Sequence, residues 1–400
     1  MKQATSDEKV KPMPVLLRLA FRPLFLLGGA FSCVALVLWE LALSGQYSFT
    51  PYGNILFWHS HEMIFGFVSA IVVGFLLTAV QNWTSIPSIK GKKLAVLVGV
   101  WLLARVLMLM SFTPQWLMLA IDVLFLPLAG YWLAKPIIAV GQTRNLFFVP
   151  IIVLLSAANL FMHLGVILKI PALYSHGFMS AIWLITLLMS LLGGRVIPFF
   201  TANATKTPKP EPLVWLEIMS LGSTLFICVL FFVGAIYYIP ATFIGILMVF
   251  CAVAHVIRAW RWHFSLTLNT PLLWSLHVAY WFIPVGVFLI GLSYLSNLVT
   301  VSTAFHALTV GAMGNMILSM MARVSLGHTG RQLIVRHSII IAFALILIAA
   351  IVRVFGALLI NDFSHYFIFA SVIAWCLAYG VFVLVYFPIL TKPRADGRPG

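Results

Sequence analysis

Long apolar runs alternate with short polar connections along almost the whole chain. A helix that crosses a bilayer needs about 20 mainly apolar residues, and twelve runs approach that length. The pattern therefore predicts an all-α, polytopic membrane protein with twelve transmembrane helices. The predicted spans are 24–44, 57–80, 94–111, 115–133, 146–168, 177–199, 213–238, 240–260, 272–296, 301–323, 338–360 and 365–390. They form one domain (24–390) between a basic N-terminal segment (1–23) and a tail (391–400).

Composition and charge place this domain in a membrane and orient it. The 400 residues are 62% hydrophobic and 8% charged, with a formal net charge of +15. Lysine and arginine gather in alternate connections, and the opposite connections carry only Lys169. The positive-inside rule therefore predicts a bacterial inner-membrane protein with both termini in the cytoplasm. The charge is spread over these connections, so it indicates a lipid bilayer and not nucleic acid as the partner. The first 23 residues lack the features of a cleaved signal peptide, so we expect the first helix to be retained.

The second, sixth and tenth predicted spans resemble one another. Each begins near a histidine at its outer end, namely His61, His176 and His306, and continues through a stretch of small residues. A recurrence every four helices predicts three four-helix pseudo-repeats arranged as a ring. Small residues permit close helix contacts in membranes. We expect such contacts at the centre of the ring from Gly66, Gly74, Gly193, Gly194, Gly311 and Gly314.

Histidines are enriched at one depth, near the outer ends of the predicted spans. Imidazole is costly inside a bilayer, and it is a frequent ligand of haem and copper. The pattern therefore predicts a metal or haem site near the periplasmic side. The outer histidines are His59, His61, His163, His176, His306 and His365.

Two of these histidines are close in sequence but should point apart. On a helix, His59 and His61 project roughly 200° from one another, so they should not face the same metal. Glu62 follows His59 by three residues and could orient its ring. Alignment with His306 favours His61 as the cofactor ligand, with His59 as the alternative. His163 lies at a similar depth to His176, so this pair could hold a second metal such as copper.

Charged residues inside the spans need partners. Arg105 and Asp122 are about equally far from the turn that joins their helices, which predicts an ion pair. Arg353 has no such partner within its span. A guanidinium binds carboxylates bidentately, so Arg353 suits a haem propionate, and Arg105 is a second candidate. Asp362 in the adjacent connection is the other possible partner of Arg353.

The sulfur-containing residues show no metal or redox spacing. The cysteines lie in four different spans, and we expect them to act as small buried hydrophobes. Three methionines of the tenth span follow helical spacing and should form a packing surface. These residues are Cys33, Cys228, Cys251, Cys376, Met313, Met316 and Met320.

Several blocks of the sequence together resemble the NnrS family. They are FRPLFLLGGAF (21–31), WHSHEMIFGFVSAIVVGFLLTAVQNWT (58–84), ANLFMHLG (158–165), GRVIPFFT (194–201) and HALTVGAMGNMILSMMARVSLGHTGR (306–331). The resemblance implies an inner-membrane protein associated with haem and copper, found with denitrification and nitric-oxide defence genes. By architectural analogy it also suggests the twelve-helix ring of haem–copper oxidases. The seventh span lacks the adjacent histidines that bind copper in those oxidases, so any such centre would be built differently.

Two main hypotheses follow. The first is a haem- and copper-containing membrane protein that binds or turns over nitric oxide near the periplasmic face, and so acts in detoxification or resistance to nitrosative stress. The alternative is a secondary transporter that exports a metal or a nitrosyl-iron species, since twelve helices is also a common transporter count. A sensor or assembly factor is a third hypothesis that no feature of the sequence favours.

Overall fold

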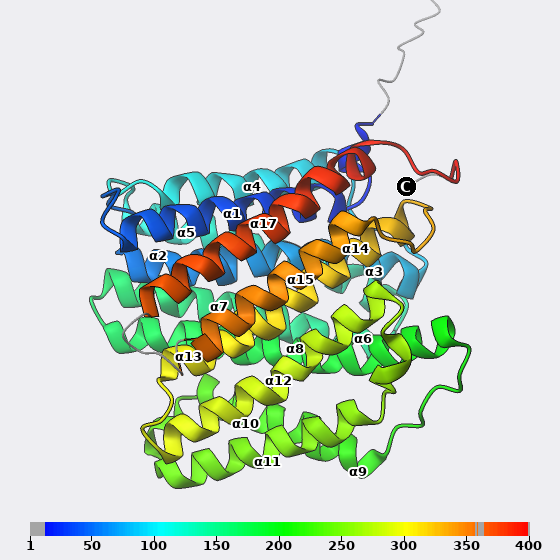
Figure 1. Cartoon of the computed structure of the whole chain (residues 1–400). Helices are drawn as coiled ribbons and strands as arrows, with labels where there is room; N and C mark the ends of the chain where they lie inside the picture. Colours follow the sequence, from blue (N-terminus) through cyan, green and yellow to red (C-terminus); the bar gives the residue numbers. More distant parts are fainter. Residues whose placement is uncertain (1–12, 357, 359–363, 399–400) are drawn as a thin grey trace, which may run out of the picture.

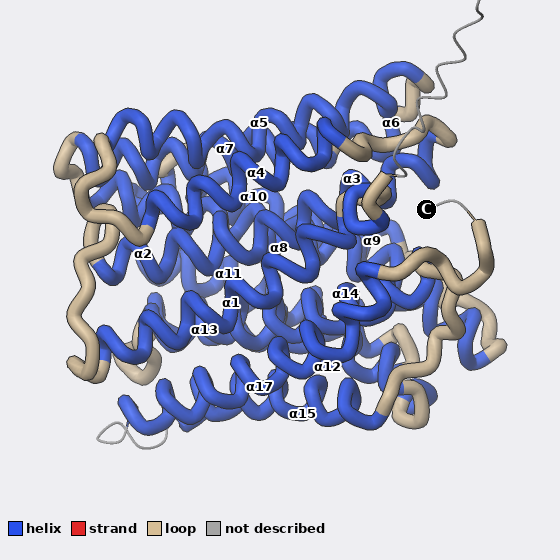
Figure 2. The backbone as a smooth tube through the Cα atoms, turned by 90° about the horizontal axis from the view of Figure 1, so that it is seen from above, coloured by secondary structure: helices blue, strands red, loops and turns tan. Residues whose placement is uncertain are grey.

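The computed structural model describes residues 13–356, 358 and 364–398, and in that part of the chain all regular structure is helical. The helices run side by side, with the loops gathered at the two ends of the bundle (Figures 1 and 2). In chain order they are η1 (Val15–Leu17), α1 (Phe21–Leu43), α2 (Ile55–His61), η2 (Glu62–Val68), α3 (Ser69–Thr84), α4 (Lys92–Met108), α5 (Gln115–Ala139), α6 (Thr143–Leu146), α7 (Phe148–Ile167), α8 (Pro171–Thr205), α9 (Val214–Glu217), η3 (Ile218–Gly222), α10 (Ser223–Phe232), η4 (Ala235–Tyr238), α11 (Ala241–Trp260), η5 (Phe264–Thr267), α12 (Pro271–Leu295), α13 (Val301–His306), η6 (Ala307–Gly314), α14 (Asn315–His328), α15 (His337–Ile351), η7 (Val352–Gly356) and α17 (Ser364–Thr391).

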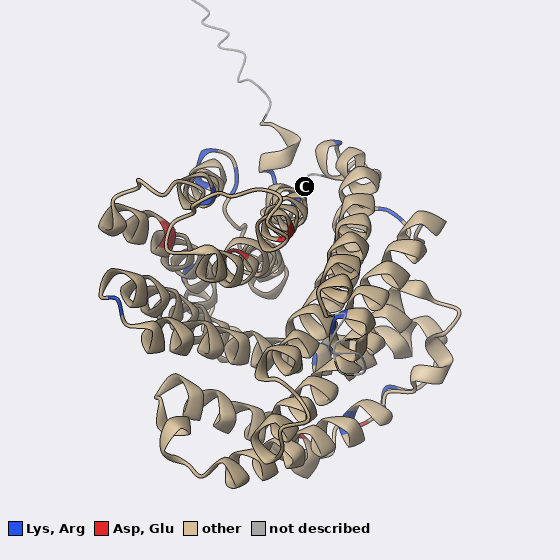
Figure 3. Ribbon diagram, turned by 60° about the vertical axis from the view of Figure 1, so that its left-hand side comes forward, with Lys and Arg blue, Asp and Glu red and all other residues tan. Residues whose placement is uncertain are grey.

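The predicted polytopic membrane fold is confirmed. Eleven helical segments of the described chain are long and apolar enough to cross a bilayer. The one predicted span outside these eleven is 94–111, which corresponds to α4, a helix of 17 residues. Charged residues occupy few positions along the bundle (Figure 3). The largest difference from prediction is α8, which continues to Thr205 because the polar residues after the apolar run still form helix.

The ring of three units is also confirmed. The units are α1–α5 (21–139), α7–α11 (148–260) and α12–α17 (271–391). The first helix of each unit packs on the last helix of the preceding one: α7 on α5, α12 on α11, and α1 on α17. The second span of each unit faces the centre, where α8 contacts both η2 and η6, and α3 contacts α14. The ring therefore brings together three spans that are far apart in sequence.

Both ends of the described chain lie at one end of the bundle. Arg22, in the first turn of α1, donates from Nη1 to the carbonyl oxygens of Leu390 (2.8 Å) and Lys392 (3.0 Å) at the end of α17. We call this end the terminus face, and the opposite end, formed by connections such as 44–54 and 109–114, the far face. The identification of the terminus face with the cytoplasm stays a prediction.

In the described part of the chain, four π-helical stretches interrupt the spans, and each lies beside or contains a polar residue; η3 follows Glu217. The stretch η2 follows His61, η6 follows His306 in the equivalent span of the third unit, and η7 contains Arg353. In a π-helix the backbone carries an extra residue per turn, which rotates the side chains that follow, and such stretches are frequent at functional sites. The central span of the second unit, α8, is α-helical throughout.

The six glycines of the central spans do make close contacts, but their partners differ from the prediction. A Cβ atom on Gly193 would lie 2.8 Å from the ring of Tyr280, and one on Gly314 would lie 2.5 Å from Trp375. Gly66 similarly leaves room for the Arg105 guanidinium. These glycines therefore admit large side chains from the surrounding helices, and do not bring the three central helices against each other.

Candidate functional site

A cavity of about 540 Å³ lies between α1, α2, η2, α8, α13, η6, η7 and α17, on the far-face side of the ring centre. Most of its wall is apolar, with side chains such as Trp39, Phe67 and Trp375. Two imidazoles and one guanidinium also line it, those of His59, His306 and Arg353. We call this space the outer cavity. A largely apolar pocket with a few polar groups is typical of small-molecule and cofactor sites, whose volumes run from about 300 to 1,000 Å³.

His306 ends helix α13 and presents one free ring nitrogen to the outer cavity. Its Nδ1 lies 2.7 Å from the carbonyl oxygen of Ser302, one turn earlier. A carbonyl oxygen can only accept, so Nδ1 carries the proton and Nε2 keeps its lone pair. This is the arrangement in which histidine binds metals, with one nitrogen fixed by a backbone carbonyl and the other free to coordinate.

His59 faces the same cavity from α2. Its ring stacks on Trp39 with the centroids 4.2 Å apart and the planes inclined by 21°. Its Nδ1 atom is buried and has no hydrogen-bond partner among the residues that the structure describes. Most buried polar atoms in proteins have a hydrogen-bond partner, so this nitrogen is available to bind a ligand. His59 is therefore a second candidate ligand.

Arg353 brings a positive charge to the cavity wall from η7. Its Nη2 lies 3.5 Å from Ser302 Oγ and 3.2 Å from His306 Nδ1. Nδ1 already donates to Ser302, so it cannot also accept from the guanidinium. No carboxylate of the described chain pairs with Arg353, and the predicted alternative partner, Asp362, lies outside the described residues. The guanidinium is thus placed to receive an anionic group of a molecule in the cavity.

A second polar site is buried between the first unit and helix α7 of the second unit. It consists of His61, Glu62, Arg105, Asp122, Asn159 and His163, all of which are nearly inaccessible to solvent. We call these six residues the buried polar cluster. The predicted ion pair is confirmed, because Arg105 Nη2 donates to Asp122 Oδ1. Arg105 Nη1 also donates to Glu62 Oε1 at 2.6 Å, so one guanidinium joins two carboxylates.

The two histidines of the cluster converge on one carboxylate oxygen. Asp122 Oδ2 lies 3.0 Å from His61 Nε2 and 3.1 Å from His163 Nε2. The other ring nitrogens are also held: His61 Nδ1 lies 2.9 Å from Glu62 Oε1, and His163 Nδ1 lies 3.4 Å from the hydroxyl of Tyr52. The Asn159 amide donates to Asp122 Oδ2 (2.7 Å), and its oxygen lies 2.8 Å from His61 Nε2.

This geometry can hold a metal ion. One atom from each of His61, Asp122 and His163 lies within 4.8 Å of the others. The ligands of a tetrahedral ion bound at about 2.1 Å are about 3.4 Å apart, which is close to the two separations given above. Histidines that bind metals usually donate their other ring nitrogen to a carboxylate, carbonyl or water. Glu62 can accept in this way from His61, and Tyr52 from His163. Two imidazoles and a carboxylate suit zinc, copper(II) or iron(II).

The same contacts also suit a cluster that binds a proton in place of a metal ion. With both ring nitrogens donating, His61 is a cation. Two cations, His61 and Arg105, then balance two anions, Glu62 and Asp122. Such balance lowers the cost of burying the charges. The cluster can therefore accept either a proton or a metal ion at His61 Nε2.

The predicted site residues divide between these two places. His59, His306 and Arg353 line the outer cavity, whereas His61, His163 and Arg105 belong to the buried polar cluster. The expectation that His59 and His61 diverge is confirmed. The prediction that Glu62 orients His59 is wrong, because the Arg105 charge draws Glu62 toward His61.

His176 stands apart from both groups. Its Nε2 lies 3.0 Å from the carbonyl oxygen of Phe232, and its ring contacts Phe161 and Tyr237. The sequence reasoning missed the contributions of Asn159 and Tyr52. A signal for Asn159 was present, since it precedes His163 by one helical turn in an otherwise apolar span.

Another polar network lies between the second unit and helix α12 of the third unit, toward the terminus face. Arg258 makes a bidentate ion pair with Glu217, through Nε (2.9 Å) and Nη2 (2.6 Å), and donates to the Tyr280 hydroxyl at 2.7 Å. Tyr280 is in turn 2.8 Å from His255 Nδ1, and His255 Nε2 is 2.8 Å from the hydroxyl of Thr224. Each of these polar groups has a partner, so the network serves to hold the helices together.

Comparison with known proteins identifies the family. A family model described as NnrS protein matches residues 15–394. A comparison with curated proteins returned no match.

Proposed function

The match covers nearly the whole chain, so the protein belongs to the NnrS family, and on this premise we propose that it binds haem in the outer cavity and nitric oxide at that haem. Family membership suggests a membrane protein related to nitric oxide. The proposed role is the binding or detoxification of nitric oxide under nitrosative stress. The single observation that carries the proposal is the joint position of His306, His59 and Arg353 on one apolar cavity of about 540 Å³.

The residues of the cavity fit a haem. His306 Nε2 would bind the haem iron, because the Ser302 carbonyl oxygen accepts from Nδ1 and leaves the lone pair of Nε2 available. Arg353 would bind a propionate, since its charge has no described acidic partner. When bound, the iron would supply the coordination position for nitric oxide. The aromatic and aliphatic wall would exclude water, and His59 would supply a second imidazole to the cavity.

The buried polar cluster is the proposed copper site. His61, His163 and Asp122 would hold the ion, with Glu62 and Tyr52 orienting the imidazoles. This nitrogen–oxygen donor set favours copper(II) over copper(I). We place both sites on the periplasmic half of the membrane, because the positive charge of the sequence assigns the terminus face to the cytoplasm.

The first experiment is a visible absorption spectrum of the protein in detergent, reduced with dithionite, before and after nitric oxide. A Soret band that shifts with the gas is expected. The His306→Ala variant should lose this band, whereas His263→Ala, at a turn between α11 and α12, is the matched control and should keep it. A colourless wild-type protein that is fully inserted and folded would overturn the proposal and leave transport as the leading hypothesis.

A further inference from the structure

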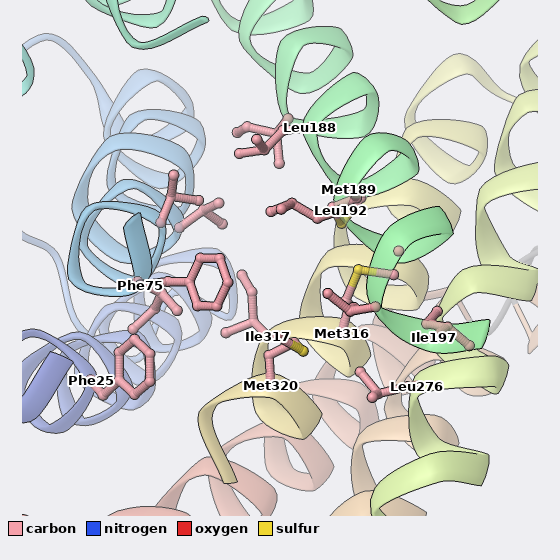
Figure 4. A pocket seen from close by; sticks show the side chains of 16 residues that line it. Phe25, Phe75, Leu188, Met189, Leu192, Ile197, Leu276, Met316, Ile317 and Met320 are labelled. Carbon is pink, nitrogen blue, oxygen red and sulfur yellow. The ribbon is translucent and has the colours of Figure 1, made fainter. Parts of the chain in front are cut away.

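A second, smaller cavity lies at the centre of the ring, on the terminus-face side of the outer cavity. Its volume is about 70 Å³, and the three central spans and the flanking helices α1 and α12 line it. Figure 4 shows Phe75, Leu188 and Met316 projecting into this space from three different helices. We call it the inner cavity. None of the polar residues assigned above to the haem or metal sites lines it.

The two cavities are stacked along the axis of the ring. On α8, Ile182 lines the outer cavity and Ile185, one turn later, lines the inner one. On the third central span, Met313 lines the outer cavity and Met316 lines the inner one. On the first central span, Val68 borders both. On α8 and on the third central span the inner cavity therefore begins about one helical turn beyond the outer cavity, and on the first central span the two cavities share Val68.

The apolar wall of the inner cavity determines which kind of molecule can bind there. Every residue that lines the inner cavity has an apolar side chain or is a glycine. A buried water needs two to four polar partners, and apolar cavities stay dry and bind xenon or small hydrocarbons. The spans are helical, so their backbone groups are already paired. The wall therefore disfavours water, ions and any polar ligand.

The volume of the inner cavity further limits which molecules can bind there. An engineered cavity of about 150 Å³ holds one benzene molecule, and the inner cavity is about half as large. A lipid chain or a quinone ring is too large for this space, whereas a diatomic gas fits.

We propose that the inner cavity is a holding site for a small uncharged gas, nitric oxide, on its way between the bilayer and the outer cavity. This inference rests on the proposed function for the identity of the gas, but not for the existence of the site. Nitric oxide partitions into apolar surroundings, so a dry cavity beside the haem raises its local concentration. It also holds the gas while the iron position is occupied.

Xenon is the probe, because it resembles a diatomic gas in size and binds without any haem. A structure of the wild-type protein, prepared under xenon pressure, should show one xenon peak between Val68, Leu188 and Met316. The variant Leu188→Phe fills this space and should lose the peak. Leu225→Phe makes the same change on the lipid-facing side of α10, where Leu225 is 50% exposed, and should keep it. Water density, a lipid chain, or no peak in the wild-type cavity would overturn the proposal.

A kinetic measurement then tests the role of the site. In the haem-loaded protein, photolysis of bound nitric oxide should be followed by a fast rebinding phase from gas held nearby. Leu188→Phe should reduce the amplitude of that phase several-fold, and Leu225→Phe should leave it unchanged. Equal amplitudes in both variants would refute the holding role. If the protein carries no haem, the proposed function fails, but the xenon result still decides whether the inner cavity is a gas site.

Discussion

Arg105 is the residue on which the charge balance of the buried polar cluster depends most directly. It donates to Glu62 Oε1 at 2.6 Å and to Asp122, and all three side chains are buried. The variant Arg105→Met keeps most of the volume but leaves two carboxylates with the single cation of His61. Removal of one partner of a buried ion pair typically costs about 3–5 kcal/mol. We expect a loss of that size in the free energy of unfolding.

The double variant Arg105→Met/Asp122→Asn provides the decisive comparison. It removes one cation and one anion together, so Glu62 and His61 again balance. Residues in one ion-pair network show coupling energies of roughly 0.5–3 kcal/mol. The double variant should therefore lose less free energy of unfolding than the sum of the losses of Arg105→Met and Asp122→Asn, by an amount in that range.

Reversible unfolding in mixed detergent and dodecyl sulfate, followed by circular dichroism, measures these free energies. Arg195→Met is the matched control, because Arg195 is only partly buried and its hydrogen bond to Asn145 at 3.2 Å is not an ion pair. This variant should lose about 1 kcal/mol or less. If the double variant loses as much as the sum of Arg105→Met and Asp122→Asn, the four groups do not share one charge balance, and the description of the cluster is wrong.

Three further predictions concern the cofactors and the closure of the ring. Arg353→Leu should weaken haem retention about 10- to 100-fold, since a hydrogen bond to a charged group contributes about 1.5–3 kcal/mol, and haem content after repeated detergent washing measures it. Glu62→Gln should lower the copper affinity about 10- to 100-fold, while leaving the His306-dependent haem band in place, as metal analysis and spectra of one sample will show. Cys33 and Cys376 should form a disulfide on mild oxidation, because each thiol lies within 3.7 Å of the other residue's carbonyl oxygen. After cleavage of a central loop, the two halves of the oxidised protein should stay joined on a non-reducing gel. In the Cys33→Ser variant the two halves should separate.

The positions of the helices were predictable, because the thickness of the bilayer sets the length of each apolar run. The depth of each histidine followed from its position on its span. The direction in which each histidine points around its helix could not be predicted, because that direction depends on the π-helical stretches η2 and η6. The sequence gives no signal for these stretches. The ion pair of Arg105 and Asp122 could be predicted from the short turn between their helices.

Contacts that depend on the closure of the ring could not be predicted in the same way. Cys33 and Cys376 are 343 positions apart, and they meet only because α1 packs on α17. The sequence places the four cysteines in four different spans, with no spacing that indicates this contact. The convergence of His306 and Arg353 with His59 likewise requires the first and third units to face each other across the centre.

Helix α2 is the physical link between the two candidate sites. It has only seven residues, and its N-terminus is fixed by the Asn54 side chain, which accepts a hydrogen bond from the amide of Phe57 at 2.9 Å. From this short helix His59 lines the outer cavity and His61 belongs to the buried polar cluster. A shift of α2 on binding at one site would therefore also move a side chain of the other site. The two functions should nevertheless separate by substitution. His61→Ala removes a cluster ligand and should abolish copper binding while haem is retained, whereas His306→Ala should do the reverse. Loss of both cofactors in each variant would mean that the two sites are one centre.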